Sequence, residues 1–193
     1  DNDNIQTLVS CSTHDSLLFF TNKGKVYQSK GYDIPEYGRT AKGIPVVNLL
    51  NIEKEEYVKE IIALHPSEEN QYLFFVTKNG IVKRSDVNAY ANIRNNGLIA
   101  LNMREDDELI NVLVTNGQQN IIIGSHNGYA MTFAETDARI MGRTATGVRG
   151  MKLREGDYVV GAAVLNPESN VLVVTERGYG KHTPASEYAV KNR

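Results

Sequence analysis

The stretch "YLFFVTKNGIVKRS", residues 72–85, has the form of a β-hairpin. An apolar run ends at Val76, a polar "TKNG" tetrad follows, and a second strand-like run begins at Ile81. A glycine at the end of such a tetrad supplies the positive φ that a tight hairpin turn needs. The stretch therefore predicts two antiparallel strands joined at Gly80.

The same pattern occurs four times along the chain, and the glycines that end the four tetrads are Gly24, Gly80, Gly128 and Gly178. Two more apolar runs, separated by an acidic turn ("EKEE", "REDDE" or "REGD"), follow each of the first three hairpins. Repeats of about 50 residues with four short strands are typical of propeller-like rings. We therefore expect an all-β chain, an incomplete ring of four-stranded blades with units at about 1–52, 53–103, 104–153 and, as a partial unit, 154–193.

An arginine follows each hairpin glycine at a nearly constant distance of 14 or 15 residues. Two of these arginines lie in nearly identical hexapeptides, "GRTAKG" at 38–43 and "GRTATG" at 142–147. The four arginines are Arg39, Arg94, Arg143 and Arg193. Because they hold equivalent places in the repeat, we expect them on equivalent loops of successive blades.

The net charge of −2 conceals a strong segregation of charge along the chain. Of the 21 Lys and Arg residues, 17 lie in the stretches from hairpin turn to arginine loop, which carry +10, while the rest of the chain carries −12. Equivalent segments of a ring share one face or rim, so we expect a cationic stripe with the acidic turns elsewhere. Such a stripe suits a continuous polyanion.

The chain offers no pattern of a catalytic, metal or nucleotide site. Cys11 is the only cysteine, which excludes a disulfide framework, and the acidic run 105–108 occupies the same turn as its relatives in other units. No apolar run approaches the ~18 residues of a membrane-spanning helix. We therefore expect a binding module of a reducing compartment rather than an enzyme or a membrane protein.

Several long blocks resemble the C-terminal domain of the A chain of bacterial DNA gyrase, in the right order over essentially the whole sequence. They are "FFTNKGKVYQSKGYDIPEYGRTAKGIPVVNLL" (19–50), "IRNNGLIALNM" (93–103), "GRTATGVRGMKLREGD" (142–157) and "VTERGYGKHTPASEY" (174–188). The resemblance implies a β-pinwheel in which neighbouring blades exchange strands and double-stranded DNA wraps around the outer rim. The chain would be an internal fragment of about three and a half blades.

The same resemblance implies a role in ATP-dependent negative supercoiling, with no catalytic residues in this fragment. ATP and Mg belong to other domains, the partners are the rest of gyrase A and gyrase B in an A2B2 holoenzyme, and the location is the bacterial cytoplasm at the nucleoid. Two alternatives stay open: the corresponding domain of topoisomerase IV, and a propeller that serves as a protein-interaction scaffold.

The cations of the repeat are the candidate DNA-binding residues. The loops supply Arg39, Lys42, Arg94, Arg143, Arg149 and Arg193, and the hairpins supply Lys25, Lys83, Arg84 and Lys181. Contacts of Lys and Arg with phosphates carry little base specificity, so we expect sequence-independent binding. One or two phosphates per unit predict a salt slope of roughly −4 to −7.

Overall fold

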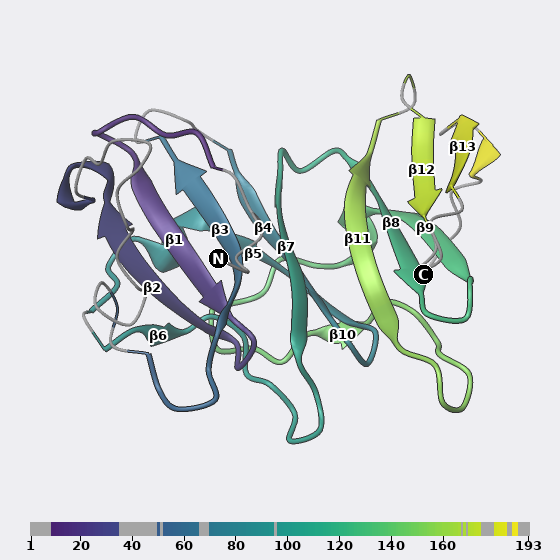
Figure 1. Ribbon diagram of the computed structural model, residues 1–193, viewed down its shortest axis with the longest axis horizontal. Helices are drawn as coiled ribbons and strands as arrows, with labels where there is room; N and C mark the ends of the chain where they lie inside the picture. Colours follow the sequence, from purple (N-terminus) through teal and green to yellow (C-terminus); the bar gives the residue numbers. More distant parts are fainter. Residues whose placement is uncertain are drawn as a thin grey trace, which may run out of the picture.

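The computed structural model describes residues 9–34, 50, 52–65, 70–94, 96–166, 168, 170–174, 180–184 and 187–188. Within these residues the strands form four antiparallel sheets that follow one another across the molecule (Figure 1). The described part contains no α-helix, only the 3-10 helices η1 (Gly31–Asp33), η2 (Val87–Tyr90) and η3 (Glu135–Asp137). The expected all-β, blade-like architecture is confirmed.

Two of the sheets have four strands each in the described residues. The first has the order β3-β1-β2-β6, and its strands are β1 (Ser16–Thr21), β2 (Lys25–Lys30), β3 (Val58–Leu64) and β6 (Leu98–Ile99). The second has the order β10-β5-β4-β7, and its strands are β4 (Tyr72–Thr77), β5 (Ile81–Asp86), β7 (Leu109–Thr115) and β10 (Val148–Arg149).

The other two sheets show fewer strands in the described residues. The third has the order β11-β8-β9, with β8 (Asn120–Ser125), β9 (Ala130–Ala134) and β11 (Val159–Leu165). The fourth is the hairpin of β12 (Asn170–Val174) and β13 (Gly180–Pro184).

Neighbouring repeats exchange strands, so the sheets do not follow the contiguous units expected from the sequence. The boundary placed at 52/53 separates β3 from the sheet that it completes beside β1. In addition β6 pairs with β2, although the hairpin nearest to β6 in sequence is β4-β5. Likewise β10 lies beyond the β8-β9 hairpin in the chain but pairs with β5. These last two pairings join segments more than 60 residues apart, as from Lys25 to Ile99 and from Val82 to Val148, which no local pattern specifies.

The hairpin turns form as the tetrads predict. Gly24, Gly80 and Gly128 have φ of 78, 83 and 87°, and Gly178 lies outside the described residues. The Thr77 hydroxyl accepts a hydrogen bond of 3.1 Å from the Ile81 amide, which closes the turn from the other side. The tetrad thus specifies both the glycine conformation and a side-chain cap.

Apolar side chains fill the spaces between successive sheets. Strand residues alternate in direction, so Leu73 and Phe75 pack toward the first sheet while Phe74 and Val76 pack toward the third. The Phe75 ring meets Phe20 of β1 at 5.6 Å between centroids. Because the second sheet is covered on both faces, even its polar strand positions are removed from water.

The inner edges of the sheets converge on β7. The Asn111 side chain of β7 donates to Glu60 Oε2 of β3 at 3.3 Å, and its Oδ1 accepts from the Ala162 amide of β11 at 3.0 Å. β6 and β10 lie at the opposite edges of their sheets. The loops that lead into β6 and β10 therefore lie at the outer edge of the molecule.

Candidate nucleic-acid interface

Two predicted arginines from successive repeats meet at this outer edge. Arg94 lies in the loop before β6 and Arg143 in the loop before β10, and both line one concavity of about 630 Å³. Asn88, Asn92 and Asn96 line it as well. Two guanidinium groups and neutral amides around one hollow form a set of hydrogen-bond donors suited to an anion.

Each arginine sits on an ordered turn. Arg94 is exposed, and its carbonyl accepts from the Gly97 amide at 2.8 Å, in a turn where Gly97 has a φ of 76°. Arg143 Nη1 donates to the Ile99 carbonyl of β6 at 2.7 Å. Arg143 therefore reaches back across the repeat boundary and stays beside the strand that follows Arg94.

Two further predicted cations flank this edge. Lys25 pairs with Ile99 across the β2-β6 register, and Arg149 is exposed on β10 opposite Ile81. Lys25 also forms an ion pair of 2.6 Å with Glu53 of the acidic turn, and this contact lowers the pKa of Glu53 below its usual range. Part of the Lys25 charge is thus already balanced within the molecule.

Lys83 and Arg84 do not lie on the surface, which removes them from the set of direct phosphate contacts. Lys83 is 0% exposed and Arg84 is 7% exposed, because both lie on a strand with a sheet against each face. Arg84 Nη1 pairs with Glu135 Oε1 at 3.5 Å, and the guanidinium lies 5.4 Å from the centre of the Tyr72 ring. The cation-rich "VKR" of β5 therefore serves contacts between sheets.

Four predicted contacts cannot be placed by side chain. Arg39, Lys42 and Arg193 lie outside the described residues. Lys181 lies on β13, whose described part does not include that side chain. Their role stays a prediction.

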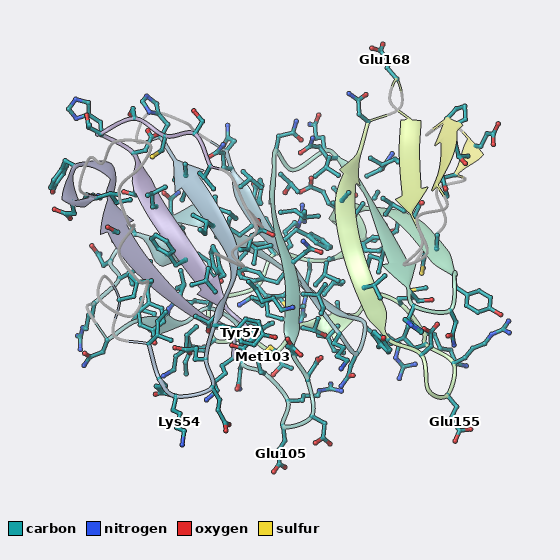
Figure 2. The ribbon with its side chains drawn as sticks, viewed as in Figure 1. Lys54, Tyr57, Met103, Glu105, Glu155 and Glu168 are labelled. Atoms are coloured by element: carbon teal, nitrogen blue, oxygen red, sulfur yellow. The ribbon has the colours of Figure 1, made fainter. Side chains whose placement is uncertain are left out.

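The acidic turns lie against the hairpin turns rather than apart from them, which corrects the expectation of a fully separate cationic stripe. The Asn79 amide of one hairpin donates to Asp107 at 3.0 Å, and the Asn127 amide of the next donates to Asp157 at 3.0 Å. Figure 2 shows Lys54, Glu105 and Glu155 projecting from equivalent turns along one side of the molecule. The cations left for an external anion are thus those of the arginine loops.

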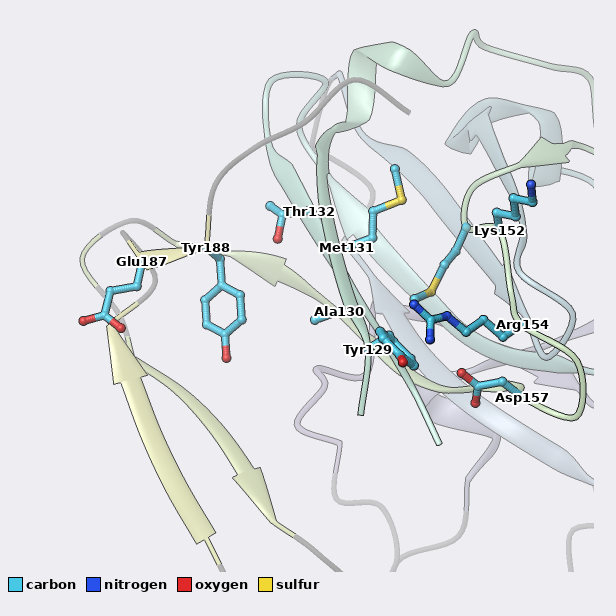
Figure 3. A pocket seen from close by; sticks show the side chains of 10 residues that line it. Tyr129, Ala130, Met131, Thr132, Lys152, Arg154, Asp157, Glu187 and Tyr188 are labelled. Atoms are coloured by element: carbon cyan, nitrogen blue, oxygen red, sulfur yellow. The ribbon is translucent and has the colours of Figure 1, made fainter. Parts of the chain in front are cut away.

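A second concavity, of about 580 Å³, holds two cations that the sequence reasoning did not select (Figure 3). Lys152 and Arg154 line it beside Tyr129, and the Arg154 guanidinium lies 4.3 Å from the centre of the Tyr129 ring. The signal was present in "MKLRE" directly after the third arginine loop. Asp157 and Glu187 also line this hollow, so its charge is mixed.

The described residues hold no group of three or more His, Cys, Asp or Glu side chains arranged to bind a metal ion. In the same residues no helix has the length and apolar character to cross a membrane.

Comparison with known proteins identifies the repeat. Residues 15–63, 71–116, 119–166 and 169–193 match the family model described as DNA gyrase C-terminal domain, beta-propeller. Each of the first three segments begins just before a hairpin and ends with the strand beside it, which is the grouping that the sheets show.

Curated relatives agree with this match. The A chain of DNA gyrase from Halalkalibacterium halodurans is 55% identical over 151 residues, 78% of this chain, and that from Streptococcus pneumoniae serotype 4 is 56% identical over 147 residues, 76% of this chain. The matched part is 18% of the length of each relative.

Solved structures with the same architecture include two C-terminal domains. The chain matches that of a DNA topoisomerase IV with a TM-score of 0.86 at 33% identity, over 94% of this chain and 57% of the other. It matches a DNA gyrase A C-terminal domain with a TM-score of 0.78 at 27% identity, over 94% of this chain and 58% of the other.

Proposed function

Because this chain belongs to the DNA gyrase C-terminal domain family, we propose that it binds and bends double-stranded DNA along its outer edge. The observation that carries the proposal is the meeting of Arg94 and Arg143, equivalent residues of successive repeats, in one outward concavity. Arg149 on β10 extends the same edge. DNA phosphates are the anions that a repeated series of guanidinium groups fits best.

Binding through these side chains would be independent of sequence. The arginines lie on short loops, and no helix long enough to enter a major groove occurs in the described residues. Each repeat would neutralise one or two phosphates, and successive repeats along the curved edge would bend the duplex. Smooth bending costs on the order of 1–6 kcal/mol, which several such contacts would offset.

We place the domain in gyrase rather than topoisomerase IV. Identity to the gyrase A relatives reaches 55–56%, whereas identity to the topoisomerase IV domain is 33%. In this proposal the domain supports ATP-dependent negative supercoiling, in a holoenzyme with the rest of gyrase A and with gyrase B at the bacterial nucleoid in the cytoplasm. ATP, Mg and DNA cleavage would belong to the other parts of the enzyme.

The test is fluorescence anisotropy with two 40-bp duplexes of unrelated sequence, together with energy transfer between dyes at the duplex ends. We expect affinities for the two duplexes that agree within about threefold, and closer duplex ends on binding. A difference of about 100-fold between the duplexes would contradict sequence-independent binding. Unchanged energy transfer at saturation would contradict bending.

A protein-interaction scaffold is the competing function, and it is separated by capture of partners from a bacterial lysate. If nuclease treatment removes the captured proteins, DNA mediates the association, as we expect. Capture that survives the nuclease, combined with no duplex binding in the anisotropy assay, would replace the DNA proposal with the scaffold.

A further inference from the structure

A buried ammonium group lies directly behind the arginine concavity. Lys83 Nζ donates to the Ala100 carbonyl and to the Arg143 carbonyl, each at 2.5 Å. The same nitrogen lies 5.0 Å from the centre of the Phe75 ring and 6.0 Å from that of Tyr90. Lys83 is thus enclosed by aromatic rings and two backbone carbonyls.

The two carbonyls belong to the two segments that form the outer edge. Ala100 directly follows β6, and Arg143 is one of the candidate phosphate contacts. The Arg143 guanidinium in turn donates to the carbonyl of Ile99, the residue beside Ala100. Lys83 and Arg143 therefore tie the same two segments together, one from inside and one from outside.

Packing alone does not call for a lysine at this place. The equivalent positions, three residues after the hairpin glycine, hold Tyr27 in the first repeat and Met131 in the third. Burying an ammonium is costly, and burial together with the nearby Arg143 charge lowers the pKa of Lys83 to about 7. A neutral amine still has two N–H donors, so both hydrogen bonds can persist on either side of that pH.

We infer that Lys83 is a positioning residue for DNA binding: it holds the Arg143 backbone against β6, so that the Arg143 guanidinium is presented at the outer edge. This inference rests on the proposed function, because it assigns Lys83 a role only through Arg143. The second hydrogen bond, to Ala100, fixes the neighbouring strand end, where the Tyr90 hydroxyl also donates to the Ala100 carbonyl at 2.7 Å.

The test is a double-mutant cycle of Lys83→Met and Arg143→Ala in the 193-residue chain, with duplex affinity measured by anisotropy at about 0.1 M salt. Loss of one phosphate contact at this salt concentration weakens binding by about eightfold. We expect Arg143→Ala to show about that loss, Lys83→Met about three- to eightfold, and the double variant the same loss as Arg143→Ala within about twofold. A merely structural role would instead weaken binding further in the Arg143→Ala background.

Additive losses, or Lys83→Met binding as wild type does, would overturn the inference and leave the proposed function standing. If Arg143→Ala binds like wild type, the proposed contact itself fails. Val112→Ala is the control for lost stability, since Val112 is buried in β7 among the residues between the first two sheets, and we expect its affinity within about twofold of wild type. Should Lys83→Met fail to fold, Lys83→Gln runs the same cycle with the same two outcomes.

Discussion

Replacing Glu135 with alanine should destabilise the junction between the second and third sheets. Glu135 is 0% exposed, and its carboxylate accepts from Thr115 Oγ1 at 2.8 Å and from the Gln119 amide at 3.0 Å. It also pairs with Arg84, whose Nε is buried without a hydrogen-bond partner among the described residues. The variant would therefore leave an unpaired guanidinium and two unpaired donors in the interior.

Breaking a buried ion pair by removal of one partner costs about 3–5 kcal/mol. We expect Glu135→Ala to lower the free energy of unfolding by that amount, measured by urea denaturation followed by circular dichroism. The control is Glu105→Ala at an exposed turn, which should stay within about 0.5 kcal/mol of wild type. A loss below about 1 kcal/mol for Glu135→Ala would refute the reasoning that Arg84 depends on this carboxylate.

Two further perturbations test the sheet junctions. A Cβ at Gly80, where φ is 83°, would lie 2.6 Å from the Met151 carbonyl oxygen, whereas one at Gly128, where φ is 87°, would meet nothing within 4 Å. Positive φ alone costs about 1–3 kcal/mol, so urea denaturation should show a larger loss for Gly80→Ala than for Gly128→Ala, and equal losses would contradict the close approach. Burial raises the pKa of Glu60 above its ordinary value of 4.5, so ionisation is less favourable in the folded state and stability is lost as pH rises from the ordinary value through the raised pKa. Glu60→Gln should remove that loss and be more stable than wild type at pH 7, and an unchanged pH profile of unfolding would argue against a buried Glu60.

The sequence predicts the local parts of this fold well. Each hairpin depends on an apolar run, a capped tetrad and a glycine, and these lie within about a dozen residues, so Gly24, Gly80 and Gly128 are found directly. The spacing of Arg94 and Arg143 from these glycines also predicts that they share a kind of loop. Their meeting in one concavity follows from strand exchange, which pairs β6 with a hairpin far upstream.

The errors in the predicted site have the same origin. The prediction that Lys83 and Arg84 are surface cations rests on the adjacent charges of "VKRS". Their burial depends on Glu135, Ala100 and Arg143, which belong to other segments of the chain. One signal in the sequence points the other way: the position of Lys83 holds Tyr27 in the first repeat, a residue type that packs inside more often than lysine does.

The most direct test of the arginine edge is the salt dependence of duplex affinity for the Arg94→Ala/Arg143→Ala double variant. The matched control is Lys54→Ala/Arg104→Ala, which removes two exposed cations from the acidic turns. We predict a slope of log affinity against log salt of roughly −4 to −7 for wild type and the control, and a slope less steep by about 1.8 for the arginine double variant. A slope unchanged by the loss of Arg94 and Arg143, or changed equally by the control, would contradict DNA binding at this edge.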